Sequence, residues 1–212
     1  MKEYFKRGTT VLFYGDSITD ASRDRENPWH MGHGYAKKVA DIYNALYPES
    51  KVKFFNRGVG GDRLSDLLER YDGDVLPVRP DFVSVLIGIN DTWRRYDSGL
   101  IVTADEFEKE YRYLLERLHL DFPESGIMMI EPFLLPTDKE KECYWEDLGP
   151  KIEIVKRLAA ELADFYLSSG QVFEEEMGKG ATLLQLSEDG VHPTNEGHNC
   201  LAVKWLEIID SI

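Results

Sequence analysis

The sequence predicts an α/β protein in which helices cover both faces of a central parallel sheet of about five strands. Two observations predict this three-layer fold. Short apolar runs alternate along the chain with longer stretches whose apolar residues recur every three or four positions, which is the order typical of parallel sheets. In addition, residues 82–88 are apolar almost throughout, as expected for a strand that is covered on both faces.

The first half of the chain predicts two strand–helix units. Residues 10–14 are rich in strand formers and stop at Gly15, and residues 52–56 form a second run that leads into a glycine cluster. Each run is followed by a helix with one apolar face, and Pro48 closes the first helix. These faces consist of Tyr35, Val39, Ile42 and Leu46, and of Leu64, Leu67, Leu68 and Tyr71.

The second half of the chain continues the same alternation. Residues 82–88 and 126–130 are predicted strands, and residues 164–167 form a weaker one. Thr103 and Glu106 form a capping box, which predicts the start of a helix. Three further helices are predicted, and the last of them starts near Pro193. Their apolar faces consist, in chain order, of Phe107, Tyr111, Leu114 and Leu118; of Ile152, Val155, Leu158 and Leu162; and of Leu201, Trp205 and Ile208.

The composition and charge argue against several classes of protein. The 212 residues include 25 Lys and Arg against 39 Asp and Glu, a net charge of −14, which does not suit binding to nucleic acid or to an anionic membrane. Cys143 and Cys200 are too few for a disulfide framework or a thiolate zinc site. No apolar stretch is long enough for a signal peptide or a membrane span. We therefore expect one cytoplasmic domain, residues 1–212, with no nucleic-acid or membrane partner.

The first predicted strand ends in Gly15-Asp16-Ser17, at the edge of the sheet where sites form in this fold class. A serine directly beyond a buried strand, after a glycine that permits a tight turn, is well placed as a nucleophile. Ser17 or Thr19 could also simply cap the following segment. Thr19 moreover stands where the Gly-x-Ser-x-Gly elbow has its second glycine.

The next two strand ends carry groups that could donate hydrogen bonds to a ligand. The cluster of residues 58–61 contains three glycines, which let backbone N–H groups approach closely, although a plain turn is the alternative. A dinucleotide loop fits poorly, because Arg63 occupies the last glycine position of its motif. Asn90 could donate its side-chain amide to a developing oxyanion, or cap a helix.

Near the carboxyl end, Asp189 and His192 are three residues apart, followed by Pro193. A carboxylate at this spacing can orient an imidazole, and the proline suits a loop that enters a helix. A single histidine is most often structural, but a neighbouring aspartate in a glycine-containing loop makes a catalytic base a reasonable hypothesis.

Together these four segments resemble the motifs of the SGNH, or GDSL-type, serine hydrolases. The matching residues occur in the order of the family and span nearly the whole chain: Gly15-Asp16-Ser17, Gly61-Asp62, Gly88-x-Asn90-Asp91 and Asp189-x-x-His192-Pro193. The resemblance implies a flavodoxin-like three-layer fold and an esterase or acylhydrolase activity. Carried over by position, it implies Ser17 as nucleophile, His192 as general base and Asp189 as the residue that orients it. The implied oxyanion donors are the N–H groups of Ser17 and Gly61 and the side chain of Asn90.

The resemblance further implies an activity without a metal or organic cofactor and, through residues 87–97, similarity to intracellular acetyl-xylooligosaccharide esterases. We therefore expect an ester-cleaving enzyme for acetylated oligosaccharides, with activity that falls at acidic pH as a histidine base becomes protonated. A lysophospholipase, a thioesterase or a general short-chain acylhydrolase is the alternative, and a non-catalytic binding module is a weaker one. The resemblance to oligomeric sugar deacetylases also suggests a homo-oligomer.

Several residues around these motifs are weaker candidates. Asp16, Trp93 and Arg94 are predicted to contact the substrate. His30 and His33 are expected to be solvated loop histidines, and His198 is expected to face the surroundings of the last helix rather than the substrate. The run of residues 132–149 is long for a loop, and a lid, a contact between subunits and a plain surface loop are all open interpretations.

Overall fold

The computed structural model describes residues 4–210 and contains one sheet of five parallel strands in the order β2-β1-β3-β4-β5. This is the flavodoxin-like order. The strands are β1 (Thr10–Gly15), β2 (Lys53–Gly58), β3 (Phe82–Leu86), β4 (Gly126–Ile130) and β5 (Phe165–Leu167). All five residues of β3 are buried, which agrees with its apolar sequence and its central place.

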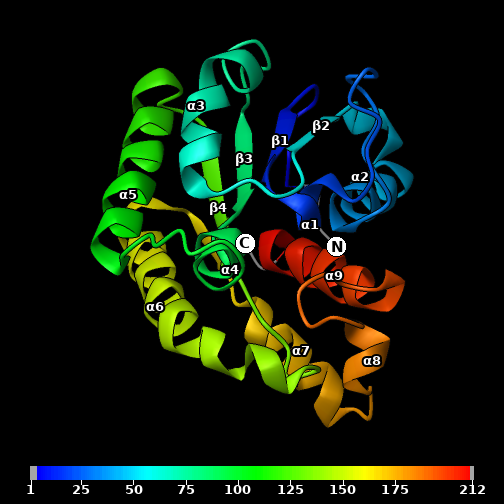
Figure 1. Cartoon of the computed structure of the whole chain (residues 1–212). Helices are drawn as coiled ribbons and strands as arrows, with labels where there is room; N and C mark the ends of the chain where they lie inside the picture. Colours follow the sequence, from blue (N-terminus) through cyan, green and yellow to red (C-terminus); the bar gives the residue numbers. More distant parts are fainter. Residues whose placement is uncertain (1–3, 211–212) are drawn as a thin grey trace.

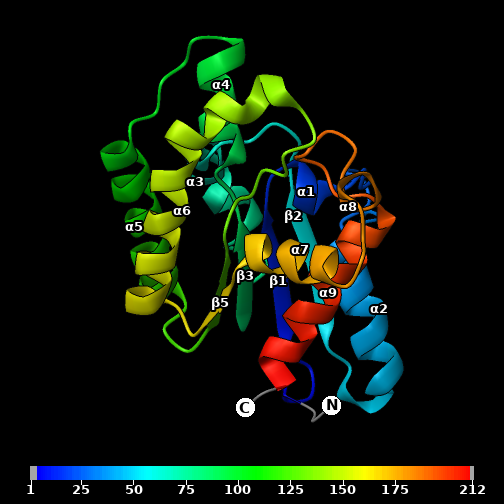
Figure 2. The ribbon, with the colours of Figure 1, turned by 90° about the horizontal axis from the view of Figure 1, so that it is seen from below.

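Helices cover both faces of this sheet, as Figures 1 and 2 show. One face packs against α3 (Leu64–Asp74), α5 (Ala104–Asp121) and α6 (Trp145–Leu162), and the other against α2 (Tyr35–Leu46), α7 (Ser169–Gly178) and α9 (Asn195–Asp210). The shorter helical segments are α1 (Ser17–Asp20), α4 (Ile89–Asp97), α8 (Leu183–Leu186), η1 (Pro48–Ser50) and η2 (Lys139–Tyr144). The predicted three-layer α/β/α fold is therefore confirmed.

The two core layers follow from the alternation of side chains along the strands. In β1, Val11 and Phe13 belong to the layer under α2 and α9, whereas Leu12 and Tyr14 belong to the layer under α3 and α5. Trp205 of α9 is fully buried in the first layer, and its indole N–H donates to Ser84 Oγ at 3.0 Å. Packed apolar side chains thus cover both faces of the sheet and hold its strands in place.

Some predicted details of the helices differ from the structure. Leu46 is exposed at the end of α2, and Ile208 is only partly buried, because Leu206 and Ile209 take the inward positions of α9. Residues 132–149 are not one long loop, since they include η2 and the first turn of α6. Residues 132–135 are themselves buried, so this segment is part of the packed structure.

The end of β1 lies very close to β3, and only glycine permits this approach. A Cβ atom at Gly15 would stand 2.2 Å from the carbonyl oxygen of Leu86. The absence of a side chain therefore lets the chain turn directly out of the sheet into α1. This turn brings the residue two positions later, Ser17, to the carboxyl edge of the sheet.

Candidate active site

The carboxyl ends of β1, β2 and β3 are adjacent in the sheet, and each leads into one of the motifs singled out in the sequence. Ser17 begins α1, residues 59–63 connect β2 to α3, and Asn90 lies in the first turn of α4. Asp189 and His192 lie in the segment between α8 and α9. Parallel pairing therefore gathers segments from across the whole chain at one edge.

Ser17 occupies the first position of α1, where Asp16 is the N-cap residue. The Asp16 carboxylate accepts the N–H of Ile18 at 2.9 Å, which fixes the turn that presents Ser17. The side-chain oxygen of Ser17 lies 2.9 Å from Nε2 of His192, although the two residues are 175 positions apart in the chain. The structure thus brings these two predicted residues into hydrogen-bond contact.

His192 also contacts Asp189, with 2.6 Å between Nδ1 and Oδ2. An ionised carboxylate only accepts hydrogen bonds, so this contact places the proton on Nδ1 and leaves Nε2 to accept the Ser17 hydroxyl. The other oxygen of Asp189 accepts the N–H groups of Val191 and His192 at 2.9 and 2.7 Å. Burial raises the pKa of Asp189, but these hydrogen bonds outweigh it and lower the pKa to about 2.

The predicted donors Gly61 and Asn90 belong to the segments that follow β2 and β3, the two strands that flank β1. A Cβ atom at Gly60 would be 3.8 Å from Cβ of Ser17, so the loop after β2 passes directly beside the hydroxyl-bearing residue. Gly61 has φ of +88°, a conformation that favours glycine. Asn90 donates one amide hydrogen to the carbonyl of Asp62 at 2.9 Å, which leaves its second amide hydrogen for another acceptor.

The backbone N–H groups of Ser17 and Gly61 donate no hydrogen bond to another group within residues 4–210. The Ser17 amide belongs to the first turn of a helix, where N–H groups have no partner inside the helix. Both amides can therefore serve an external acceptor such as the oxygen of a polarised carbonyl.

Two buried carboxylates neighbour these donors in the chain, since Asp16 precedes Ser17 and Asp91 follows Asn90. Asp16 is fully buried, and burial, together with the charges of Asp91 and Asp62, raises its pKa to about 7. Burial likewise raises the pKa of Asp91 to about 7, although its carboxylate accepts the N–H of Leu64 and so caps α3. With no exposed surface, Asp16 has no means of contacting a substrate. Its predicted substrate contact is therefore replaced by a role as the N-cap of α1.

Trp93 and Arg94, the other predicted substrate contacts, do lie at the site. The indole of Trp93 is partly exposed, and its ring centroid is 6.2 Å from that of His192. The Arg94 guanidinium would lie 3.5 Å from a Cβ atom at Gly61, so it borders the loop of residues 59–63. It also pairs with Asp97. Both residues project from α4 toward the edge where Ser17 lies.

Lys141 is a residue of the site that the sequence did not reveal. Its ammonium group donates to the carbonyl of Asp189 at 2.6 Å and lies 5.0 Å from the centroid of the Trp93 ring. The same segment, η2, stacks Tyr144 on Tyr96 with 4.2 Å between centroids. Residues 139–144 therefore form a wall of the site, and no local pattern in the sequence signals these long-range contacts.

A cavity of about 560 Å³ opens at Ser17 and His192. Its polar lining includes Asp20, His33 and Asn195. His33 is exposed as predicted, but it stands on the wall of this cavity. His198 also lines the cavity, although the sequence places it away from the substrate. It is buried and accepts the N–H of Tyr35 on Nδ1 at 3.1 Å, and burial with neighbouring Lys38 and His192 lowers its pKa to about 4.

Within residues 4–210, no group of three or more His, Cys, Asp or Glu side chains is arranged to hold a metal ion. In the same part of the chain, no helix has the length and apolar character needed to cross a membrane.

Fold and site together define the class of protein. A model of the GDSL-like lipase and acylhydrolase family matches residues 13–200, and the chain belongs to this family. The chain is also 33% identical over 208 residues to an acetylxylan esterase from Geobacillus stearothermophilus, covering 95% of this chain and 94% of that protein. These findings make this protein an esterase, that is, a carboxylic ester hydrolase.

Solved structures agree with this assignment. The crystal structure of the acetylxylan esterase from Geobacillus stearothermophilus has a TM-score of 0.87 at 32% identity and covers 97% of this chain and 96% of that one. An α/β hydrolase from the metagenome of Lake Arreo has a TM-score of 0.88 at 26% identity, covering 99% of this chain and 98% of that one. The similarity therefore extends over nearly the full length of both proteins.

Proposed function

We propose that this esterase removes acetyl groups from acetylated oligosaccharides through a catalytic triad of Ser17, His192 and Asp189. The observation that carries the proposal is the continuous chain of contacts, 2.9 Å from Ser17 to His192 and 2.6 Å from His192 to Asp189. These distances suit proton transfer from a hydroxyl to an imidazole that a carboxylate orients.

The geometry supports the following course of reaction. Nε2 of His192 takes the hydroxyl proton as Ser17 Oγ bonds to the ester carbonyl carbon, and the carbonyl oxygen becomes an oxyanion. The bond between that carbon and the oxygen of the sugar then breaks, and the proton on His192 passes to the leaving sugar alkoxide. Water attacks the acetyl-enzyme in the same way, which releases acetate and restores Ser17. Asp189 remains ionised throughout and stabilises the imidazolium.

The oxyanion is stabilised by the amides of Ser17 and Gly61 and the side chain of Asn90. They are preorganised donors, because two are backbone groups in fixed turns and Asn90 is held by its bond to Asp62. The loss of one such donor typically raises the barrier by roughly 2.7–4 kcal/mol.

We expect Ser17→Ala to lower kcat for acetyl ester hydrolysis by at least about 10⁴-fold, because the nucleophile is removed. The melting temperature should stay close to that of the wild type. Ser65→Ala, at a partly buried position of α3, is the matched control and should retain full activity. Turnover of Ser17→Ala at the wild-type rate would remove Ser17 from the mechanism and contradict the proposal.

The substrate class is supported by the cavity and by a relative. The cavity beside Ser17 presents polar groups suited to sugar hydroxyls, and the relative from Geobacillus stearothermophilus is named an acetylxylan esterase. We expect kcat/KM to fall from acetyl to butyryl to octanoyl esters of one alcohol, and acetylated xylooligosaccharides to be deacetylated. A preference for octanoyl esters would instead favour the lysophospholipase or thioesterase alternative. Failure of a fluorophosphonate to label Ser17 would favour a binding module.

A single domain over residues 1–212, a cytoplasmic location and a homo-oligomer belong to this proposal as predictions from the sequence. The oligomeric state is directly measurable by light scattering.

A further inference from the structure

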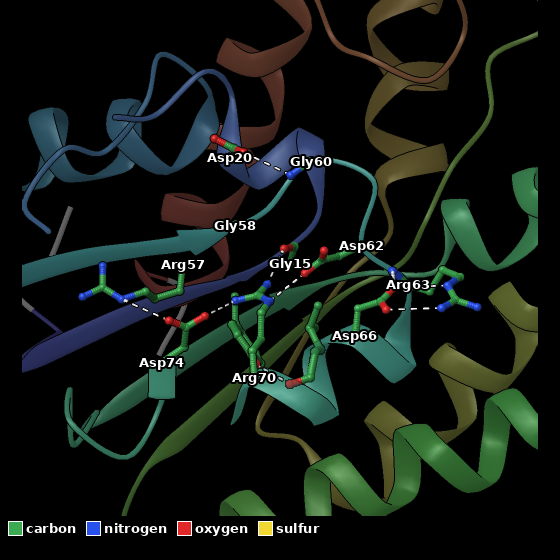
Figure 3. A network of polar contacts seen from close by, with 12 residues as sticks. Gly15, Asp20, Arg57, Gly58, Gly60, Asp62, Arg63, Asp66, Arg70 and Asp74 are labelled. Carbon is green, nitrogen blue, oxygen red and sulfur yellow. Dashed lines mark hydrogen bonds and ion pairs between the residues drawn. The ribbon is translucent and has the colours of Figure 1, made fainter. Parts of the chain in front are cut away.

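Arg70 of α3 makes an unusual set of contacts beneath the site, which Figure 3 shows. Its Nε donates to the Asp62 carboxylate at 2.6 Å, and its Nη2 donates to the carbonyl of Gly15 at 3.0 Å. Its third group, Nη1, pairs with Asp74, and the guanidinium lies 4.6 Å from the centroid of the Tyr14 ring. The side chain is only 19% exposed, so these contacts are shielded from water.

The partners of Arg70 lead to all three proposed oxyanion donors. Gly15 precedes Ser17 by two residues, and its carbonyl is held by Arg70 at the point where β1 turns into α1. Asp62 directly follows Gly61, and its backbone carbonyl accepts the side chain of Asn90 at 2.9 Å. One guanidinium therefore ties together the turn that carries the Ser17 amide, the loop that carries the Gly61 amide, and the Asn90 side chain.

Other side chains also contact the loop after β2 and the cluster around Arg70. On the opposite side of the loop, Asp20 accepts the N–H of Gly60 at 3.0 Å (Figure 3). On the α3 side, Asp74 also contacts Arg57 of β2 at 4.0 Å, which anchors the far end of the cluster. Residues 59–63 have no strand or helix of their own. Two backbone hydrogen bonds, from Val59 to the carbonyl of Gly15 at 3.0 Å and from Asp62 to that of Val59 at 3.2 Å, hold this loop together with the side-chain contacts of Asp20 and Arg70.

The planar guanidinium suits this task because its N–H groups point in fixed, divergent directions. Arg70 uses them to reach a carbonyl and two carboxylates at once. An ammonium group in the same place is a single point charge and lacks this fork. The arrangement thus depends on the shape of the side chain as well as on its charge.

We propose that Arg70 is a positioning residue that holds the three oxyanion donors of the proposed esterase in register with one another. The inference rests on the proposed function, since it assigns those donors to a developing oxyanion. Donors of this kind accelerate the reaction only where they already point at the position of the charge, and displacements of about 1 Å are costly. Arg70 touches neither the substrate nor the reacting atoms, so its loss should leave substrate binding unchanged. Displaced donors would stabilise the oxyanion less, and this would lower kcat.

The test compares Arg70→Met with a matched control, Arg117→Met. Arg117 of α5 lies 4.2 Å from the centroid of the Tyr71 ring and pairs with Asp72 and Asp121, so its surroundings are similar but distant from Ser17. We expect Arg70→Met to lower kcat by roughly tenfold to a hundredfold, with KM within about twofold of the wild type. Arg117→Met should leave kcat unchanged, and Arg70→Lys should restore part of the lost kcat.

A second readout isolates the oxyanion donors from substrate binding. A fluorophosphonate forms a bond from Ser17 Oγ to phosphorus with loss of fluoride, and its phosphoryl oxygen takes the place of the oxyanion. The rate of this labelling should fall in Arg70→Met by about the same factor as kcat, and it should not fall in Arg117→Met. If Arg70→Met does not fold, Arg70→Lys and Asp62→Asn provide the same comparison.

Three outcomes would overturn the inference: kcat of Arg70→Met within about twofold of the wild type, an equal loss of kcat in Arg117→Met, or a loss confined to KM. The result for Ser17→Ala separates this inference from the proposed function. Retained turnover in Ser17→Ala would contradict the proposed function itself, whereas a dead Ser17→Ala with a fully active Arg70→Met would contradict only the role of Arg70.

Discussion

Asp16 and Asp189 are both aspartates within a short distance of Ser17, yet their surroundings shift their pKa values in opposite directions. Burial without compensating charge raises the pKa of Asp16 to about 7. Hydrogen bonds from His192 and Val191 lower the pKa of Asp189 to about 2 in spite of its partial burial. The first residue therefore supports the turn in a largely neutral form at slightly acidic pH, while the second stays ionised as the partner of the imidazole.

The raised pKa of Asp16 predicts a specific pH dependence of stability. Because the folded state binds this proton more tightly than the unfolded chain, the contribution is fully present below about pH 4 and is lost as the pH rises to about 7. Asp16→Asn keeps an N-cap oxygen but does not titrate. Between pH 5.5 and 8, the free energy of unfolding of the wild type should therefore fall by about 2 kcal/mol relative to that of Asp16→Asn.

Urea unfolding at the two pH values measures this difference directly. Asp105→Asn, at an exposed position in the first turn of α5, is the control for the loss of one negative charge. Asp91 has a similarly raised pKa, so part of the decrease in the free energy of unfolding with pH should persist in Asp16→Asn. An identical change in the free energy of unfolding with pH for the wild type and Asp16→Asn would show that Asp16 does not titrate in this range.

At the scale of single elements, α5 shows how local sequence starts a helix independently of the site. Thr103 Oγ1 accepts the N–H of Glu106 at 3.2 Å, and Glu106 accepts the N–H of Thr103 at 2.9 Å, as the capping box in the sequence predicts. Thr103→Ala should lower the free energy of unfolding by about 1 kcal/mol and leave kcat unchanged, because α5 packs on the sheet away from Ser17. Urea unfolding and an acetyl ester assay test both parts.

Other elements could not be predicted from local patterns. In α4, the four consecutive residues Ile89 to Thr92 are buried, so the helix has no single apolar face in its sequence. Its first turn is buried because it inserts beneath the site, where Asp91 caps α3 and Asn90 holds Asp62. Helices α7 and α8 are short, and each has only a few buried residues, which gives too little periodicity to recognise.

The segment 132–149 shows the same limit on a larger scale. Its sequence, charged around residues 139–142, leaves a lid, a contact between subunits and a surface loop open as interpretations. In the structure, Lys141 reaches the carbonyl of Asp189, and Tyr144 stacks on Tyr96. These partners lie tens of residues away in the sequence, so only the folded chain shows that the segment forms a wall of the site.

At the scale of the whole molecule, the site is a consequence of parallel pairing. Strands that run in one direction end at one edge, so motifs that follow different strands meet there. The strand order places β1 between β2 and β3, which sets the Ser17 turn between the loop of Gly61 and the helix of Asn90. The packing of α9 against α2, and of the segment before it against η2, brings Asp189 and His192 to the same edge.

The sequence by itself determined the five strands, the longer helices between them, the three-layer fold class and the motifs that carry Ser17, Gly61, Asn90, Asp189 and His192. The strands, helices and fold class follow from periodicity, which is a local property of a chain. The site residues follow from the resemblance of four short motifs to those of a known family. Only the tertiary structure decided that Asp16 is buried, that Lys141 reaches the loop of Asp189, and that Arg70 connects the donor segments. Burial and hydrogen-bond partners depend on which distant residues become neighbours, and that is set by strand order and helix packing.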